Sequence, residues 1–212
     1  MDVPIRDENT LFFLDSILDK FNELIEETNI EYFIEDNVTA PTERYCEPSA
    51  LDLSKSHYGY PEEMRYVTLD GLASKMNNWL KYRTWVRTKL VPQLGMGDIA
   101  SFSYYPPEGF VGWHTNSNNV SHQLLFTWSK NGDGYFRYYD DATKKIVTQP
   151  DKVGWQCKSH YFGPRNKPLW HCCHTKGPRI TFAVKLRGEN LNAQQEKIII
   201  DWRDNIIKEI ST

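Results

Sequence analysis

The segment from Asp98 to Gly188 constrains the fold most, because it is a succession of short runs rich in aromatic and β-branched residues. Runs of this kind, separated by turn residues, are typical of β-strands. The pair Asn131-Gly132 separates two of them and is a strong short-range signal for a β-hairpin. We therefore predict one barrel or sandwich of eight strands, near residues 99–105, 110–116, 123–129, 134–140, 144–148, 153–162, 168–173 and 179–187.

Helical periodicity flanks this segment on both sides. Apolar residues at spacings of three and four predict a helix over 11–25, with Asn9 or Thr10 as its N-cap. The same spacing predicts a second helix over 72–90 and a third over 192–210. Their apolar stripes are expected to pack on the sheet.

The domain organisation follows from these patterns. The region 36–64 is rich in Pro, Glu, Ser and Tyr, which favours an irregular connection over the surface. We predict a single domain over 1–212, with a helical and irregular cover over 1–97, a β core over 98–188 and a C-terminal helix over 189–212.

Composition excludes several classes of protein. The net charge of −3 argues against broad binding to phosphate backbones, and an aromatic content of 14% argues against disorder. No apolar run approaches the roughly 20 residues of a membrane span, and the N-terminus has no signal-peptide pattern. Four cysteines, two of them adjacent, fit neither a disulfide framework nor a Cys-x-x-Cys metal site. We expect a cytoplasmic protein with reduced thiols and no membrane partner.

Strand parity brings together the residues that could carry chemistry. His114 and Asn116 are two positions apart, so their side chains point to the same face of a strand. In the predicted strand 179–187 the even positions are all apolar. Its odd positions include Arg179, Thr181 and Lys185, so that face meets solvent or a polar cavity.

These residues resemble a known motif. The stretch SYYPPEGFVGWHTN, which ends at Asn116, is followed by His171, 57 positions after His114, and by Arg-Ile-Thr at 179–181. The ordered set resembles the superfamily of Fe(II)- and 2-oxoglutarate-dependent oxygenases, which includes prolyl-hydroxylase-like and AlkB-like enzymes. That superfamily has a His-x-Asp/Glu…His motif followed by Arg or Lys. The resemblance implies an α+β fold with a double-stranded β-helix core, also called jelly-roll or cupin-like, and flanking helices at both termini.

The resemblance also implies roles for individual residues. His114, Asn116 and His171 correspond to the catalytic metal ligands, with Fe(II) as the metal. Tyr105, Arg179 and Thr181 correspond to the residues that bind the far carboxylate of the co-substrate 2-oxoglutarate. Arginine suits this task because its planar fork binds a carboxylate through two parallel hydrogen bonds.

Two points of the motif leave alternatives open. Asn116 stands where the superfamily has Asp or Glu, and an amide oxygen is a neutral and poorer metal donor. Three interpretations stay open. Asn116 is a third metal ligand, or water or halide takes the third position in an enzyme that hydroxylates or halogenates with two histidine ligands. In the third interpretation the site is degenerate and only binds a ligand. His174 is the alternative to His171 as the distal ligand, and strand parity puts the two on opposite faces.

The function expected from the resemblance is that of a 2-oxoglutarate-dependent dioxygenase hydroxylating a protein side chain or a small molecule. One alternative is a non-catalytic module that binds a ligand in the same barrel. Another is a nucleobase-directed oxygenase, which would usually carry a second arginine near Lys185 and a basic groove. The acidic balance of the chain disfavours a nucleic-acid substrate.

Overall fold

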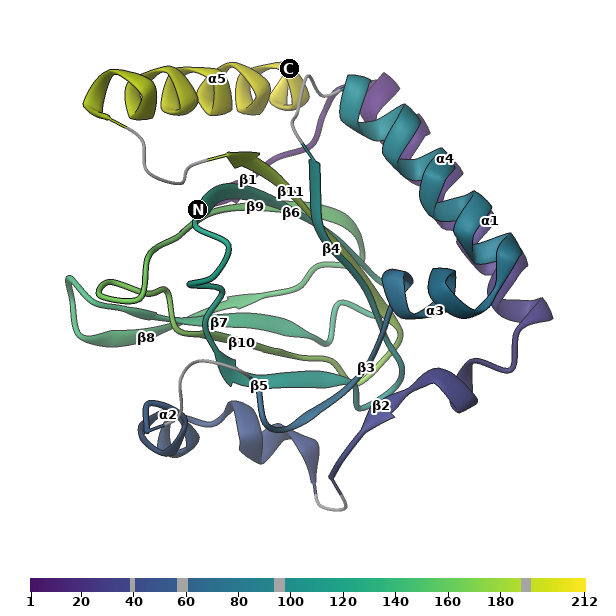
Figure 1. The fold of residues 1–212 in the computed structure, drawn as a ribbon, viewed down its shortest axis with the longest axis horizontal. Helices are drawn as coiled ribbons and strands as arrows, with labels where there is room; N and C mark the ends of the chain where they lie inside the picture. Colours follow the sequence, from purple (N-terminus) through teal and green to yellow (C-terminus); the bar gives the residue numbers. More distant parts are fainter. Residues whose placement is uncertain (39–40, 57–60, 94–97, 188–191) are drawn as a thin grey trace.

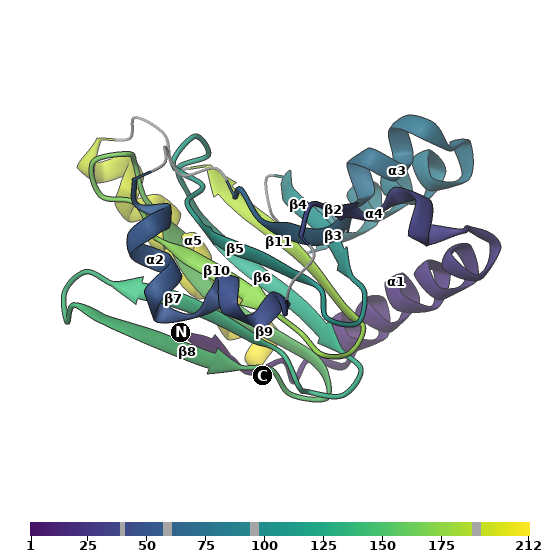
Figure 2. The same ribbon diagram turned by 90° about the horizontal axis from the view of Figure 1, so that it is seen from below.

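Two antiparallel sheets form the core of the protein. The computed structural model describes residues 1–38, 41–56, 61–93, 98–187 and 192–212. The first sheet has the order β9-β6-β11-β4, and the second has the order β8-β7-β10-β5 (Figures 1 and 2). Their bounds are β4 (Asp98–Tyr105), β5 (Phe110–His114), β6 (Ser121–Ser129), β7 (Tyr135–Asp140), β8 (Lys145–Pro150), β9 (Gly154–Phe162), β10 (His171–His174) and β11 (Arg179–Arg187).

The order of these strands defines the fold. From β4 to β11, every connection except the β7–β8 hairpin carries the chain from one sheet to the other. The two halves of the chain therefore run antiparallel to each other and wind together around the barrel. This is a double-stranded β-helix, and with its flanking helices the protein belongs to the α+β class, as predicted. All eight predicted strands are present.

The N-terminal region contributes more to the sheets than the sequence indicated. The strands β1 (Asp2–Val3) and β2 (Glu35–Asp36) pair with β9 and with β3 (Met64–Thr68), respectively. Strand β3 joins the two sheets, because one half pairs with β4 and the other half with β5. These strands were missed because each is too short to show an alternating pattern.

The prediction of an irregular surface connection over 36–64 was wrong in part. This region contains the 3-10 helix η2 (Thr42–Cys46) and the helix α2 (Pro48–Ser54), which lie against the second sheet (Figure 2). Cys46 and Leu51 are buried there with Trp113 and other apolar residues of the sheet. The two elements are too short for helical periodicity to be recognised.

Helices cover the outer face of the first sheet. They are α1 (Glu8–Glu27), α3 (Leu69–Lys75), α4 (Asn77–Gln93) and α5 (Ala193–Ser211), and a short 3-10 helix, η1 (Ile30–Phe33), follows α1. Figure 1 shows α1 and α4 side by side over one part of the sheet and α5 over another. None of the helices in the described ranges combines the length and the apolar character that a membrane span requires.

Two details of these helices differ from expectation. The N-cap of α1 is Asp7 rather than Asn9 or Thr10, because the Asp7 carboxylate accepts a hydrogen bond from the backbone N–H of Thr10 at 2.7 Å. The single helix predicted over 72–90 is two helices, because Met76 has an extended backbone (φ −137°, ψ 127°) and ends α3. The predicted domain boundaries near 97 and 189 lie outside the described residues.

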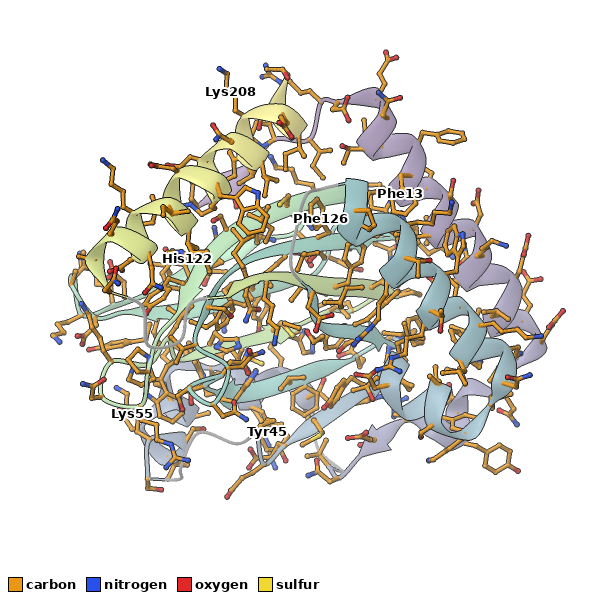
Figure 3. The ribbon with its side chains drawn as sticks, turned by 45° about the horizontal axis from the view of Figure 1, so that its top comes forward. Phe13, Tyr45, Lys55, His122, Phe126 and Lys208 are labelled. Carbon is orange, nitrogen blue, oxygen red and sulfur yellow. The ribbon has the colours of Figure 1, made fainter. Side chains whose placement is uncertain are left out.

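The alternation predicted along β11 is present and distinguishes the helix-covered face of the first sheet from the face inside the barrel. Its even residues, Ile180, Phe182, Val184 and Leu186, are buried in the apolar layer between the first sheet and the helices. Phe126 of β6, labelled in Figure 3, lies in the same layer, where its ring stacks on that of Phe182. The odd residues of β11 therefore point to the inside of the barrel, toward the second sheet.

Candidate functional site

A cavity of about 370 Å³ lies inside the barrel, between the two sheets. One wall carries hydroxyl, amide and cationic side chains of the first sheet, and the other carries side chains of β5, β7 and β10. The six residues that the sequence proposed for the site all line it: Tyr105, His114, Asn116, His171, Arg179 and Thr181. Residues far apart in the sequence therefore meet in one cavity.

His114 and His171 lie directly opposite each other on the paired strands β5 and β10. Their ring centroids are 4.0 Å apart. Nδ1 of His114 is 2.8 Å from the carbonyl oxygen of Gly112, and Nδ1 of His171 is 2.9 Å from that of Leu169. A carbonyl oxygen only accepts hydrogen bonds, so each Nδ1 carries the proton and each Nε2 keeps its lone pair. This is the arrangement that metal-binding histidines use, with the second nitrogen held by a neighbouring acceptor.

Burial keeps both imidazoles neutral. It lowers the pKa of His114 to about 4, and burial together with the neighbouring His114 lowers the pKa of His171 well below its ordinary value. A neutral imidazole is the form that binds a metal ion. Both rings are therefore in the neutral form that metal binding requires.

Asn116 follows the end of β5 and lines the cavity, together with Asn118 and Asn119 of the same loop. Among the residues that the structure describes, no three His, Cys, Asp or Glu side chains form a group that could hold a metal ion. The described lining of the cavity contains no Asp or Glu, so its oxygen donors are amides and hydroxyls. The carboxylates of Asp140 and Asp141 do not supply the missing donor, because both belong to the β7–β8 turn, where they bond to Thr143 and Lys144, respectively.

His174 does not share the site with His171. It lies at the other end of β10, where its Nε2 is 3.0 Å from the hydroxyl of Thr42 in η2 and 3.5 Å from the carboxylate of Glu108. It is not among the residues that line the cavity. Of the two alternatives for the distal ligand, only His171 is next to His114.

Arg179 enters the cavity from the first residue of β11. Its Nε donates to Oδ2 of Asp151 at 2.8 Å, and its guanidinium lies over the ring of Tyr105, 5.2 Å from the centroid. Burial opposes the charge of Arg179, but Asp151 outweighs it and raises the pKa of Arg179 above its ordinary value. Tyr105 is buried in the cavity wall, and this burial raises the pKa of its hydroxyl well above the ordinary value, so the hydroxyl stays protonated. The Thr181 hydroxyl is 3.1 Å from that of Thr127.

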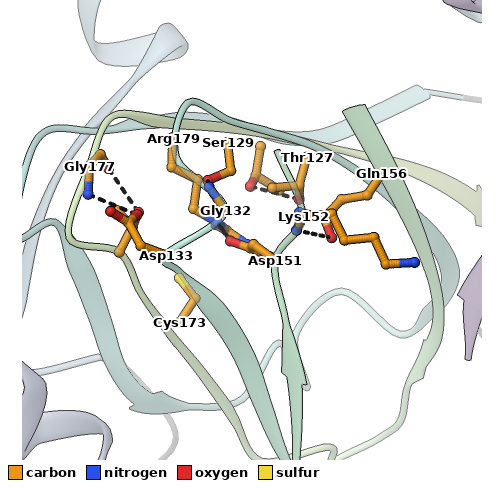
Figure 4. A network of polar contacts seen from close by, with 12 residues as sticks. Thr127, Ser129, Gly132, Asp133, Asp151, Lys152, Gln156, Cys173, Gly177 and Arg179 are labelled. Carbon is orange, nitrogen blue, oxygen red and sulfur yellow. Dashed lines mark hydrogen bonds and ion pairs between the residues drawn. The ribbon is translucent and has the colours of Figure 1, made fainter. Parts of the chain in front are cut away.

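Sequence reasoning missed two charged residues of this site. Lys158 on β9 lines the cavity, and its Nζ donates to Oδ1 of Asp151 at 2.9 Å. Lys158 is 1% exposed and Asp151 6% exposed, so both charges are buried. Asp151 directly follows β8, and Figure 4 shows its carboxylate beside Arg179. Parity was the available signal, because Lys158 shares its strand face with Gln156 and His160, all of them polar.

A third histidine, His160, is buried near the cavity and gives a pH-dependent prediction. Burial, the amino terminus of Met1 and Lys158 together lower its pKa to about 3, and its Nε2 is 2.8 Å from Oε1 of Gln149. The unfolded chain takes up a proton on this residue near pH 6.5, while the folded protein does not, so stability is present above pH 6.5 and falls as the pH drops toward 3. Between pH 5.5 and 4, the unfolding free energy of the variant His160→Gln should change less steeply with pH than that of the unmodified protein, by about 1.4 kcal/mol per pH unit. Urea unfolding of the metal-free protein at several pH values measures this slope, and an unchanged slope would refute the assignment.

Comparisons with known proteins leave the family of this chain open. No protein-family model and no curated protein matches it. Similar solved structures include a prolyl-4-hydroxylase of Pseudomonas putida (TM-score 0.36, 12% identity, 70% of this chain and 89% of that one). They also include the ribosomal oxygenase YcfD of Escherichia coli (TM-score 0.32, 16% identity, 72% of this chain and 38% of that one). A third is the CENP-C cupin domain of Drosophila melanogaster (TM-score 0.35, 12% identity, 86% of this chain and 99% of that one). The chain thus spans 38% of the length of YcfD. The strand order of this chain, rather than these alignments, identifies its core as a double-stranded β-helix.

Proposed function

We propose that the protein is an Fe(II)- and 2-oxoglutarate-dependent dioxygenase that hydroxylates a small molecule or a protein side chain. The observation that carries this proposal is the pair His114 and His171. Two neutral imidazoles face each other with free Nε2 atoms, in a cavity that also holds the buried cation Arg179.

The residues fit the two groups that the proposal requires. His114 and His171 would hold the metal through Nε2, and the amide oxygen of Asn116 is the available third protein donor. Arg179 would bind the far carboxylate of 2-oxoglutarate, assisted by the hydroxyl of Thr181. When bound, Fe(II) would activate dioxygen, the oxidant, so that one oxygen atom hydroxylates a C–H bond and the other oxidises 2-oxoglutarate to succinate and CO₂.

The chain itself contributes orientation and exclusion of water. The carbonyls of Gly112 and Leu169 hold the two imidazole rings in one tautomer and one orientation. Tyr105 supports the guanidinium of Arg179 from one side. The barrel walls keep these groups out of bulk water, which strengthens their interaction with a bound anion.

Two measurements test this function. Calorimetric titration without oxygen should show that 2-oxoglutarate binds much more tightly when Fe(II) is present. Incubation in air with Fe(II) and 2-oxoglutarate should produce succinate above the buffer control, even without the true substrate, through slow uncoupled turnover. If metal-dependent binding and succinate are both absent, the oxygenase proposal fails.

Asn116 gives a separate prediction. The change Asn116→Asp places a charged carboxylate where the neutral amide lies and should tighten Mn(II) or Co(II) binding by at least about 10-fold, since even indirect partners of metal ligands change affinity by that much. The matched control is Asn118→Asp, which adds the same charge to a neighbouring cavity residue. Equal gains for both variants would show a general electrostatic effect and would contradict coordination at position 116.

One observation favours a second function, that of a non-catalytic ligand-binding module. The described residues offer no carboxylate beside the two histidines, so the metal would be held more weakly than in a site with Asp or Glu. A module that binds its ligand without metal should bind a carboxylate equally well in EDTA, whereas the oxygenase should lose 2-oxoglutarate. A nucleobase-directed enzyme is tested by binding to single-stranded DNA at low salt. In this fold Lys185, where such enzymes have a second arginine, donates to Asn119 at 3.2 Å.

A further inference from the structure

Lys158 is buried in the middle of a strand that faces the cavity. It belongs to β9, its side chain is 2% exposed, and it is one of the residues that line the cavity. A lysine is rarely buried unless it is paired, because desolvation disfavours its charge. Burial lowers the pKa of Lys158, while the contact with Asp151 opposes that effect.

Asp151 pairs with two cations at once. Its Oδ1 accepts from Lys158 Nζ at 2.9 Å, and its Oδ2 accepts from Arg179 Nε at 2.8 Å. Burial alone would raise the pKa of Asp151, but the two cations outweigh it and hold the pKa below its ordinary value. The carboxylate is therefore ionised and lies between the two positive side chains.

The backbone holds Asp151 in this place. Its N–H donates to the carbonyl oxygen of Gly134 at 2.8 Å. A Cβ atom at position 134 would lie 2.6 Å from Oδ2 of Asp151, so the absence of a side chain at Gly134 leaves room for the carboxylate. The position of the two cations thus depends on a fixed anion.

The charges of this cluster do not balance. Two cations and one carboxylate leave one unit of positive charge in a buried place, and both cations line the cavity while Asp151 does not. An uncompensated buried charge is unfavourable unless a partner of opposite sign can bind. The cluster thus favours an anionic ligand in the cavity.

We propose that Lys158 is a second carboxylate-binding residue of the cavity, and that Asp151 is a positioning residue that holds Lys158 and Arg179 for one carboxylate group of a dicarboxylate ligand. Arg179 offers a planar fork and Lys158 a compact ammonium, so together they can contact both oxygens of one carboxylate. The inference rests on the proposed function only for the identity of the ligand as 2-oxoglutarate.

The test uses glutarate without metal as the probe, because glutarate has the two carboxylates of 2-oxoglutarate but lacks the keto group that would need the metal. Lys158→Met leaves Asp151 paired with Arg179 and the cluster neutral, so the protein should still fold. Its glutarate affinity should fall about 10- to 100-fold, as expected for the loss of one hydrogen bond between charged groups. Lys158→Arg keeps the charge and should retain most of the affinity. Lys152→Met removes an exposed lysine just beyond Asp151 and should bind like the unmodified protein.

A measurement on the unmodified protein separates binding from a purely structural role. In protein labelled with ¹⁵N-lysine, the Nζ resonance of Lys158 should shift when glutarate is added, and that of Lys152 should not. Lack of this shift, or a Lys158→Met variant that binds glutarate as tightly as the unmodified protein, would overturn the inference.

A parallel titration with 2-oxoglutarate, with and without Fe(II), distinguishes the two proposals. Lys158-dependent glutarate binding without any metal-dependent 2-oxoglutarate binding would support the cation pair and reject the oxygenase. Metal-dependent binding of 2-oxoglutarate that is insensitive to Lys158→Met would support the oxygenase and reject the role of Lys158. If neither ligand binds, both proposals fail.

Discussion

Replacing Asp151 by Asn should lower the free energy of unfolding by about 3–5 kcal/mol, the cost typical of breaking a buried ion pair by removing one partner. The variant keeps the shape of the side chain but leaves Lys158 and Arg179 buried beside each other without an anion. Equilibrium unfolding in urea at pH 7 measures the change. The exposed pair Asp141–Lys144 provides the control, because Asp141→Asn should change stability by less than about 1 kcal/mol.

The same variant should change the response to acid. The pKa of Asp151 is lower in the folded protein than in the unfolded chain, so its stabilising contribution is present above the unfolded value of 3.8 and is lost as the pH falls through the lower folded value. Asp151→Asn should therefore lose less stability than the unmodified protein below pH 4. A variant as stable as the unmodified protein at pH 7 would contradict the assignment of a buried, shared carboxylate.

Replacing either His114 or His171 by Gln should reduce metal affinity by more than about 100-fold. Losing a residue that only hydrogen-bonds to a metal ligand typically costs about 10- to 100-fold, and losing the ligand itself should cost more. Each variant would remove one of the two imidazoles whose free Nε2 atoms face each other across β5 and β10. Titration with Co(II), followed by its visible absorption and by calorimetry, measures the affinity. Circular dichroism and thermal unfolding show whether each variant keeps the fold.

His174 supplies the matched control for this prediction. It lies on the same strand as His171, is equally buried, and contacts Thr42 rather than the cavity. His174→Gln should therefore leave Co(II) affinity unchanged within about a factor of two. If His174→Gln weakens metal binding as strongly as His171→Gln, the metal site lies elsewhere and the proposed function loses its main support.

Much of the fold was predictable because local patterns carry it. The alternation along β11 and the aromatic and β-branched runs depend only on which face of a strand is buried. The hairpin expected at Asn131-Gly132 was wrong, because the turn joins β6 of the first sheet to β7 of the second, and these two strands do not pair. The same reasoning failed where the pattern was short, as in β3 and α2. It also failed at Met76, the single residue between the end of α3 and the start of α4. In such places backbone conformation depends on contacts with distant parts of the chain.

The candidate site was predictable in part, through the motif rather than through chemistry. The resemblance named His114, His171, Arg179, Thr181, Tyr105 and Asn116, and all six line one cavity. Neither Asp151 nor Lys158 belongs to a motif. Strand parity groups Lys158 with Gln156 and His160 on one polar face, but a polar face with a lysine ordinarily points to solvent, so parity alone did not place Lys158 inside the barrel.

The sequence by itself determined which residues are inside and outside each strand, because side-chain direction alternates with a period of two whatever the partner strands are. Only the tertiary structure decided which of the inward-facing residues meet one another inside the barrel. The pairing of β5 with β10 brings His171 rather than His174 to His114, and the turn after β8 places one carboxylate between two cations from β9 and β11. Such contacts depend on strand register and chain crossing, and a buried charge is stable only where that register supplies its partner.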